Sequence, residues 1–241
     1  MSWHLGRMCG FDLETTGVDT EADRIVTACV VQVGGHQPVQ TANWLADPGI
    51  AIPAGAARVH GITTERARAE GRPAAEVVTD VVAALAQVAL SGVPIVIMNA
   101  SYDLTLLDRE ARRHNVQPLT EAVGDDLRVI DPRILDKQIS RRKGSRTLTD
   151  LCQHYGVRLD GAHSADADAI AACRVAWRLG STRPELAALP LEQLHQQQIG
   201  WAREQGDSLA AYFARTPGKE SQAAGVRTEW PLVPAPQGED A

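Results

Sequence analysis

The stretch GFDLETTG, Gly10 to Gly17, places Asp12 and Glu14 on either side of one leucine at the end of an apolar run. In a strand over residues 7–14, alternate side chains point to opposite faces, so the two acids share a face. Neighbouring carboxylates repel one another and lose hydration on burial, unless a cation or another compensating group lies between them. The stretch therefore predicts either a metal site or an acidic strand end that faces water.

Composition excludes several classes of protein. Apolar residues make up 44% of the chain and charged residues 22%, which is typical of a globular protein and not of a disordered one. Neither a signal peptide nor an apolar run of membrane-spanning length is visible. The 4 cysteines lie far apart and form no Cys-x-x-Cys pair, which argues against a thiolate zinc site and a secreted disulfide framework. We expect a cytoplasmic protein with no membrane partner.

The charge distribution is uneven. The net charge of −6 disfavours a protein that coats nucleic acid non-specifically, because phosphate binding needs a concentrated positive face. Residues 131–146, however, are strongly cationic. Their basic side chains are Arg133, Lys137, Arg141, Arg142, Lys143 and Arg146. A solvated helix face and a surface that guides phosphates both fit this pattern.

Hydrophobic periodicity predicts a mixed sheet. Strands over residues 24–33 and 38–46 follow the first strand and meet at Gly34-Gly35 as a hairpin. The run PIVIMN, Pro94 to Asn99, indicates a buried strand, and LRVID at 127–131 indicates another. Helical patterns cover residues 64–70, 74–90, 101–114, 133–141, 147–156 and 164–179. A hairpin followed by alternating strands and helices indicates an α/β fold with helices on the faces of its sheet.

The composition changes after Ser181. Residues 189–215 form an amphipathic pattern that fits one long helix, or two shorter helices broken near Gly206. Beyond Thr216 the chain is rich in Pro, Gly and Gln, which is typical of disorder. We therefore expect one domain over residues 1–181, and a helical extension with a disordered tail over residues 182–241.

Further acids lie where such a fold would bring them towards the first strand. Asp103, in NASYDLTLL, follows a buried strand, and open α/β sheets place ligands at the carboxyl ends of their strands. Asp168 follows His163 in HSADADAIAA, at the start of a helix. Taken singly, each acid is also explained by the helix dipole, which favours acids in the first turn.

Together these residues resemble a known family. The matching segments, in chain order, are Asp12-x-Glu14, Asn99-Ala-Ser-Tyr-Asp103 and His163-x-x-x-x-Asp168. They resemble the motifs of the DEDDh-type 3′–5′ exonucleases, the group of the DNA polymerase III epsilon proofreading subunit and ribonuclease T. The segment VHGIT, Val59 to Thr63, is similar to another stretch of that family, and the resemblance covers about residues 7–180. It implies a ribonuclease H-like fold and hydrolysis of terminal phosphodiesters of DNA, or of RNA, to nucleoside 5′-monophosphates.

The family pattern also implies a role for each motif residue. Asp12 would bridge two Mg²⁺ or Mn²⁺ ions, Glu14 and Asp168 would complete the nucleophile-side ion, and Asp103 would hold the other. His163 would act as the general base. Physical chemistry agrees, because hard cations prefer oxygen ligands and in-line phosphoryl displacement uses paired ions. An imidazole also exchanges protons near neutral pH.

Substrate contacts follow from the same resemblance. Leu13 would lie against the terminal base, and Thr15 near the sugar hydroxyl. That position of Leu13 requires a bulge or turn, because in a regular strand its side chain points away from the acids. We expect His60 and Asn99 to line one pocket, although Asn99 could equally cap the strand-to-helix turn. Many relatives have a histidine where this chain has Met98, which places a polar contact there in doubt.

The expected partner is a single-stranded 3′ end of DNA or RNA. The sequence is compatible with a homodimer, and also with a polymerase partner that binds through the helix at 189–215. The alternative function is a catalytically silent nucleic-acid-binding or polymerase-associated scaffold module of the same fold. A degenerate module of that kind should have lost a ligand, whereas all the motif positions are filled here.

Overall fold

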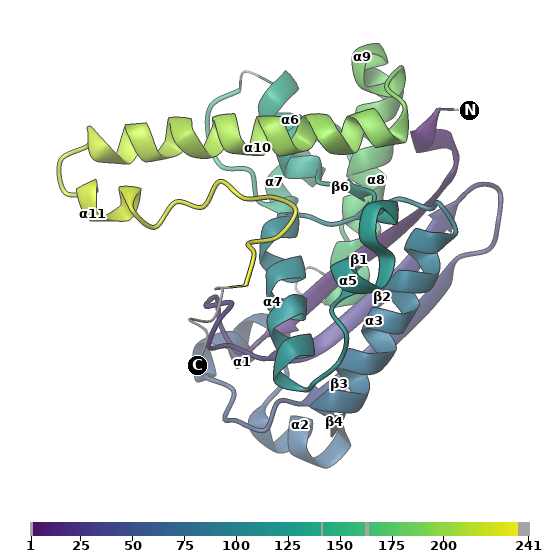
Figure 1. The fold of residues 1–241 in the computed structure, drawn as a ribbon, viewed down its shortest axis with the longest axis vertical. Coiled ribbons are helices and arrows are strands. Elements are labelled where there is room, and N and C mark those ends of the chain that lie inside the picture. The colour runs from purple at the N-terminus through teal and green to yellow at the C-terminus, as the bar shows by residue number, and fades with distance from the viewer. Residues whose placement is uncertain (1, 141, 162–163, 236–241) are drawn as a thin grey trace.

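The centre of the fold is a six-stranded mixed sheet with the order β4-β3-β2-β1-β5-β6 (Figure 1). The computed structural model describes residues 2–140, 142–161 and 164–235. Strands β1, β2 and β3 are antiparallel, whereas β5 runs parallel to β1, β6 to β5, and β4 to β3. The strands span Arg7–Thr15 (β1), Ile25–Gly34 (β2), Gln40–Asp47 (β3), Arg72–Pro73 (β4), Ile95–Val96 (β5) and Val129–Ile130 (β6).

Helices cover both faces of this sheet. Helices α3, α4 and α5 share one apolar core with β1, and α7 and α8 share another with the opposite face. The helices span Ala54–His60 (α1), Thr64–Glu70 (α2), Ala74–Leu90 (α3), Ala100–Arg113 (α4), Leu119–Val123 (α5), Pro132–Ile139 (α6), Leu148–Tyr155 (α7), Ala165–Thr182 (α8), Pro184–Ala187 (α9), Leu191–Ala214 (α10) and Glu220–Ala223 (α11). The mixed sheet flanked by helices confirms the expected fold class. Within the described ranges, no helix combines the length and the apolar character needed to cross a membrane.

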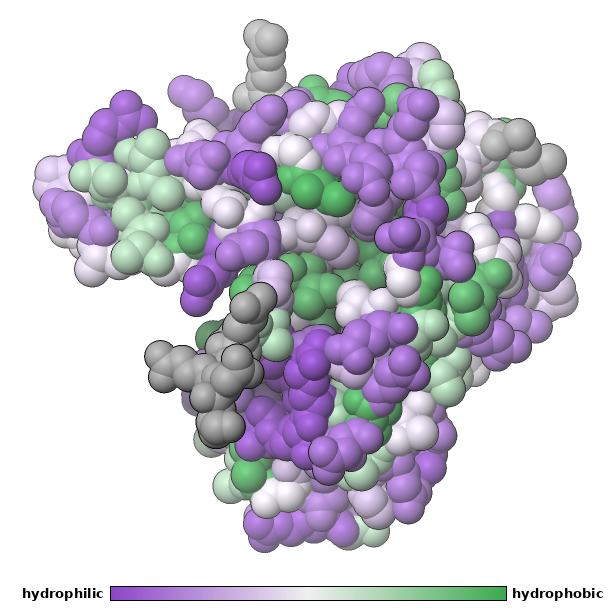
Figure 2. Space-filling view, viewed as in Figure 1, coloured by the Kyte–Doolittle hydropathy of each residue, from purple (hydrophilic) through white to green (hydrophobic). Residues whose placement is uncertain are grey.

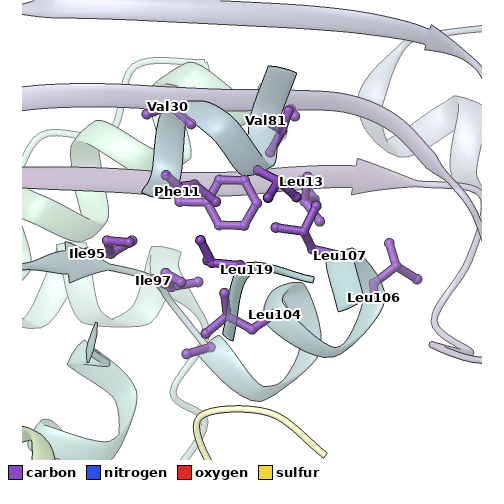
Figure 3. Close-up of a cluster of buried hydrophobic side chains, with 14 of the residues drawn as sticks. Phe11, Leu13, Val30, Val81, Ile95, Ile97, Leu104, Leu106, Leu107 and Leu119 are labelled. Carbon is purple, nitrogen blue, oxygen red and sulfur yellow. The ribbon is translucent and has the colours of Figure 1, made fainter. Parts of the chain in front are cut away.

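Strand β1 divides its side chains between the two faces. Phe11 and Leu13 point into the core beneath α3 and α4, where they meet Leu104 and Leu107 (Figure 3). The intervening positions belong to the other face because side chains alternate along a strand. That face receives α8, the helix that carries Asp168.

Gly10 allows α8 to lie directly against β1. A Cβ atom at this position would lie 2.5 Å from the carbonyl oxygen of Ala169 and 3.0 Å from Sγ of Cys173. Real Cβ atoms do not approach a backbone oxygen that closely, so only glycine permits this contact. The close packing fixes the first turns of α8 beside the acidic end of β1.

Helix α10 closes the edge of the sheet at β6. The N–H of Val129 donates to Nδ1 of His195 at 3.0 Å, and the carbonyl of Val129 accepts from Nε2 of Gln198 at 2.9 Å. Oε1 of Gln198 then accepts from the N–H of Asp131 at 2.8 Å. Backbone groups of an edge strand need partners when they are buried. Here two side chains of a helix supply them.

The tail after α10 differs from its sequence-based expectation. Instead of the disordered chain expected beyond Thr216, residues 216–235 turn back over the body, and Trp230 is 6% exposed (Figure 1). The N–H of Val233 donates to Oγ1 of Thr105 at 2.9 Å, and Arg109 donates to the carbonyl of Pro234 at 3.0 Å. The buried Trp230 and the hydrogen bonds to α4 therefore hold a segment whose sequence shows no hydrophobic periodicity. The division into residues 1–181 and 182–241 stays a prediction.

Gly206 does not break α10, which is continuous from Leu191 to Ala214. A Cβ atom at Gly206 would lie 2.8 Å from Cγ2 of Thr228 and 3.1 Å from the carbonyl oxygen of Arg227. The glycine therefore marks the place where the returning tail crosses the helix. A weak local helix former is tolerated because the tertiary contact requires it.

Candidate active site

Three carboxylates meet where β1 ends beside α8. Asp12 and Glu14 lie two residues apart on β1, and Asp168 lies in the first turn of α8. Each offers one oxygen, and these oxygens all lie within 4.8 Å of one another. The pairing register of β1 with β2 shifts between Glu14 and Thr15, so the regular strand ends just after the second acid.

Asp103 approaches the same strand from α4. Its side chain is 3% exposed, and Oδ1 accepts a hydrogen bond from the N–H of Leu13 at 3.2 Å. This bond ties the first turn of α4 to the backbone between Asp12 and Glu14. Helix α4 thus brings in a fourth carboxylate that is 90 residues away in sequence from the strand it contacts.

The acids raise one another's pKa values. Burial raises the pKa of Asp12 well above its usual value, and Asp103, Asp168 and Glu14 raise it further. Burial also raises the pKa of Glu14 to about 7, with Asp168 as the next cause. Burial raises the pKa of Asp103, although the hydrogen bond from Leu13 opposes that shift.

This cluster fits a hard divalent cation. Carboxylate oxygens from β1 and α8 converge, with Asp103 of α4 close enough to act on Asp12, and the raised pKa values indicate that full ionisation without a cation is unfavourable. Oxygen ligands of this kind suit Mg²⁺ and Mn²⁺, whereas zinc sites favour nitrogen and sulfur. The donor set therefore fits a divalent metal ion.

Asp131 holds the start of α4 in place. Its side chain is 2% exposed and accepts from the N–H groups of Asn99 at 3.2 Å, Ala100 at 2.9 Å and Arg133 at 2.9 Å. It thereby caps α6 and also satisfies donors at the start of α4. Sequence analysis missed this residue. The pair Asp131-Pro132 suggests a helix start by itself, but it cannot reveal the reach to α4.

The predicted substrate contacts are separated in space. Leu13 lies in the apolar core and is 6% exposed, because the bulge comes after it rather than before it. The hydroxyl of Thr15 donates to the carbonyl of Gly17 at 2.7 Å and lies 2.6 Å from the hydroxyl of Tyr102. Tyr102 is a second residue that the sequence analysis did not single out. The roles of Leu13 and Thr15 stay predictions.

His60 and Asn99 do not line the same hollow. His60 borders a hollow of about 460 Å³ together with Glu14, and its Nδ1 accepts from the N–H of Ile62 at 3.2 Å. Asn99 adopts a left-handed backbone conformation, with φ 68°, before α4, and its side chain makes no capping bond. Its Oδ1 instead accepts from Arg133. His163 lies outside the described residues.

Comparison with known proteins identifies the family. The RNase_T family, described as exonuclease, matches residues 9–176. The chain belongs to this exonuclease family. This membership confirms the resemblance to DEDDh-type 3′–5′ exonucleases, whose members are hydrolases that use divalent metal ions.

Individual relatives share this fold over part of their length. The PolC-type DNA polymerase III of Oceanobacillus iheyensis is 27% identical over 169 residues, which are 70% of this chain and 11% of that protein. E. coli exonuclease I in complex with a dT13 oligonucleotide superposes with a TM-score of 0.60 at 20% identity, over 75% of this chain and 42% of its own. The zinc-bound form of E. coli exonuclease I with single-stranded DNA superposes with a TM-score of 0.61 at 22% identity, again over 75% of this chain and 42% of its own. The chain thus spans about a tenth of the polymerase and less than half of exonuclease I.

In this exonuclease, the cationic segment divides into two groups. Arg142 and Arg146 contact Asp136 at 3.2 and 2.7 Å, and Tyr155 donates to the same carboxylate at 2.6 Å. Asp136 is fully buried, so this group is structural. Arg133 and Lys137 lie on exposed positions of α6 and form no ion pair with any described acid. Arg133, Lys137 and the exposed Lys143 are therefore available to phosphates.

Proposed function

We propose that the chain is a metal-dependent 3′–5′ exonuclease that hydrolyses terminal phosphodiesters of DNA or RNA to nucleoside 5′-monophosphates. The observation that supports this most directly is the meeting of Asp12, Glu14 and Asp168 within 4.8 Å, with Asp103 hydrogen bonded to the strand between the first two. Family membership and the oligonucleotide bound to E. coli exonuclease I point to the same chemistry. The substrate would be a single-stranded 3′ end.

The carboxylates would hold two Mg²⁺ or Mn²⁺ ions. When bound, such ions lower the pKa of a water and stabilise the negative charge that develops on the phosphate. Asp103 is 3% exposed and Asp12 is partly buried on β1, so both carboxylates are positioned by the fold before any ion arrives. The N–H of Leu13 and the N–H groups held by Asp131 fix α4 and with it Asp103.

His163 is the proposed general base, on the strength of its spacing from Asp168 in the sequence motif. An imidazole can accept a proton from the attacking water near neutral pH. The proposed contacts of the terminal nucleotide are Leu13, Thr15, His60 and Asn99. The side chain of Leu13 is buried and exposes little surface to a nucleotide. Burial lowers the pKa of His60, so its imidazole is neutral at pH 7 and can serve as a hydrogen-bonding group.

Digestion of a 5′-labelled oligonucleotide tests the function. Wild-type protein should release nucleoside 5′-monophosphates with Mg²⁺ or Mn²⁺ and stop with a chelator, and Asp12→Asn should lose activity while staying folded. Glu185→Gln is the matched control, because this exposed carboxylate on α9 lies outside the cluster. Full activity of Asp12→Asn would refute the proposal. Binding without digestion by wild-type protein would instead support the catalytically silent or polymerase-associated module.

A further inference from the structure

A hollow of about 510 Å³ separates the body from the arm made by α10, α11 and residues 224–235. We call it the arm groove. Figure 2 shows the surface hollowed between the arm and the body below it. The arm lies outside residues 9–176, the part that matches the exonuclease family. The groove is therefore formed between the shared domain, which supplies Arg133 and Lys137, and a part of this chain outside that domain.

Cations without ionic partners line the arm groove. Arg133 donates to the amide oxygen of Asn99, and Nζ of Lys137 donates to the carbonyl of Gln205 at 3.4 Å. Arg227, on the returning tail, is exposed and pairs with no described carboxylate. Ten of the 18 other arginines in the described ranges form ion pairs. The groove thus concentrates positive charge that nothing in the described chain neutralises by direct contact.

Two acidic residues at the groove, Asp131 and Glu229, offset part of this charge through Arg133 and Arg227. Asp131 is buried and already accepts from three N–H groups. Glu229 is exposed, and its carboxylate accepts from the N–H of Thr228 at 2.9 Å. Burial lowers the pKa of Lys137, and repulsion by Arg133 and Arg146 lowers it further. A negatively charged ligand would relieve this repulsion.

The arm also offers an aromatic ring. Phe213 lines the groove and is half-buried, with the ammonium of Lys219 5.8 Å from its ring centroid. Single-stranded nucleic acids bind where cations follow the phosphates and aromatic rings stack on bases, without any need for a specific sequence. An acidic peptide would use the cations but has no comparable use for the ring.

The arm groove reaches the start of α4, the helix that carries Asp103. Asn99 and Arg133 line the groove and also line a neighbouring hollow of about 320 Å³, which Arg146 borders. Asn99 directly precedes α4. A strand whose 3′ end lies among the acids could therefore continue past Asn99 into the groove.

We propose that the arm groove binds the sugar–phosphate backbone of single-stranded nucleic acid upstream of its 3′ terminal nucleotide, through Arg133, Lys137 and Arg227. This inference rests on the proposed function, because it assumes that the 3′ end lies at the acids. The family domain would then hydrolyse the terminal phosphodiester, and the arm would bind the rest of the strand.

Binding without cleavage tests this proposal. Affinity is measured by fluorescence anisotropy with labelled oligonucleotides of about 4 and about 16 nucleotides, the range of known single-strand site sizes, in the presence of a chelator. Lys137→Gln and Arg227→Gln should each weaken binding of the longer strand more than that of the shorter. Each should also reduce the slope of log affinity against log salt by about 0.7, the value for one released counterion on a single strand.

Arg203→Gln is the matched control, because Arg203 is an exposed cation on α10 that does not line the groove. It should keep the wild-type affinity and slope. Wild-type binding by both groove variants would overturn the proposal, as would a groove-dependent affinity for a polyglutamate peptide that exceeds the affinity for the oligonucleotide. If wild-type protein fails to digest but the groove variants lose affinity, the proposed function fails, whereas binding of single strands by the arm groove stands without the assignment of the 3′ end to the acids.

Discussion

The side-chain oxygen of Gln198 lies 2.8 Å from the backbone nitrogen of Asp131, a residue 67 positions earlier in the chain. Asp131 in turn receives the N–H groups at the start of α4. Helix α10 therefore supports, through one strand edge, the helix that carries Asp103. The extension contributes to the geometry of the site although it contains none of the acids.

Replacing Gln198 by leucine should destabilise the protein. The change keeps the approximate volume but leaves the N–H of Asp131 and the carbonyl of Val129 without partners, which costs about 1–3 kcal/mol. The melting temperature should fall by about 2–4 °C per kcal/mol. Gln197→Leu is the control, because Gln197 is exposed on the same helix. Equal melting temperatures for the two variants would show that the edge bonds contribute nothing.

Gly10→Ala and Gly200→Ala should have opposite effects. At Gly10 the new methyl group meets the carbonyl of Ala169, so we expect a loss of about 1–3 kcal/mol from overpacking. Displacement of α8 also moves Asp168 away from Asp12, which should lower kcat of digestion. At Gly200, exposed on α10 with open space around it, alanine should stabilise by about 0.5–1 kcal/mol. Thermal unfolding and kcat measure both, and a neutral Gly10→Ala would contradict the packing described here.

The acid cluster should make stability depend on pH in metal-free protein. The pKa of Glu14 is about 7 in the folded state, whereas the ordinary value of 4.5 applies in the unfolded state. Between these two values the folded state retains a proton that the unfolded state loses. The contribution of Glu14 is therefore complete below about pH 4.5 and is lost as the pH rises through about 7. Buried His195 acts in the opposite direction, because its pKa is lowered. The test is thus the difference in melting temperature between wild type and Glu14→Gln, which should change in favour of the variant between pH 5 and 8 with a chelator. A constant difference would contradict the raised pKa.

Metal binding should release protons near neutral pH. Carboxylates must be ionised to bind a cation, and the raised pKa values of Asp12 and Glu14 mean that protons remain on the cluster without one. Mn²⁺ affinity should therefore increase between pH 6 and 8. Calorimetry in buffers of different ionisation enthalpy would count the protons, and Glu14→Gln should release fewer. Absence of proton release at pH 6 would show that the acids are already ionised.

Sequence reasoning could reach the acids but not the residues that hold them. Alternation along a strand places Asp12 and Glu14 on one face, and Asp103 follows a strand end, so local patterns suffice for these. Asp131 and Gln198 act across distances of 31 and 67 residues, with no repeating pattern to reveal the pairing. The tail was expected to be disordered because Trp230 and Val233 are isolated among polar and turn-forming residues. Gly206 suggests a break in α10 because glycine is a weak helix former. The reason for this glycine is instead its contact with the returning tail, which local patterns do not reveal.

The way in which α10 covers β6 affects how the chain can be divided in the laboratory. A fragment that ends before α10 would leave the N–H and carbonyl of Val129 and the N–H of Asp131 facing outward on a strand at the sheet margin. Such a margin recruits further strands, so the shortened protein should self-associate. Loss of activity on truncation would then report aggregation rather than a catalytic role of the missing helix. Point substitutions on α10 are the sounder way to separate the two.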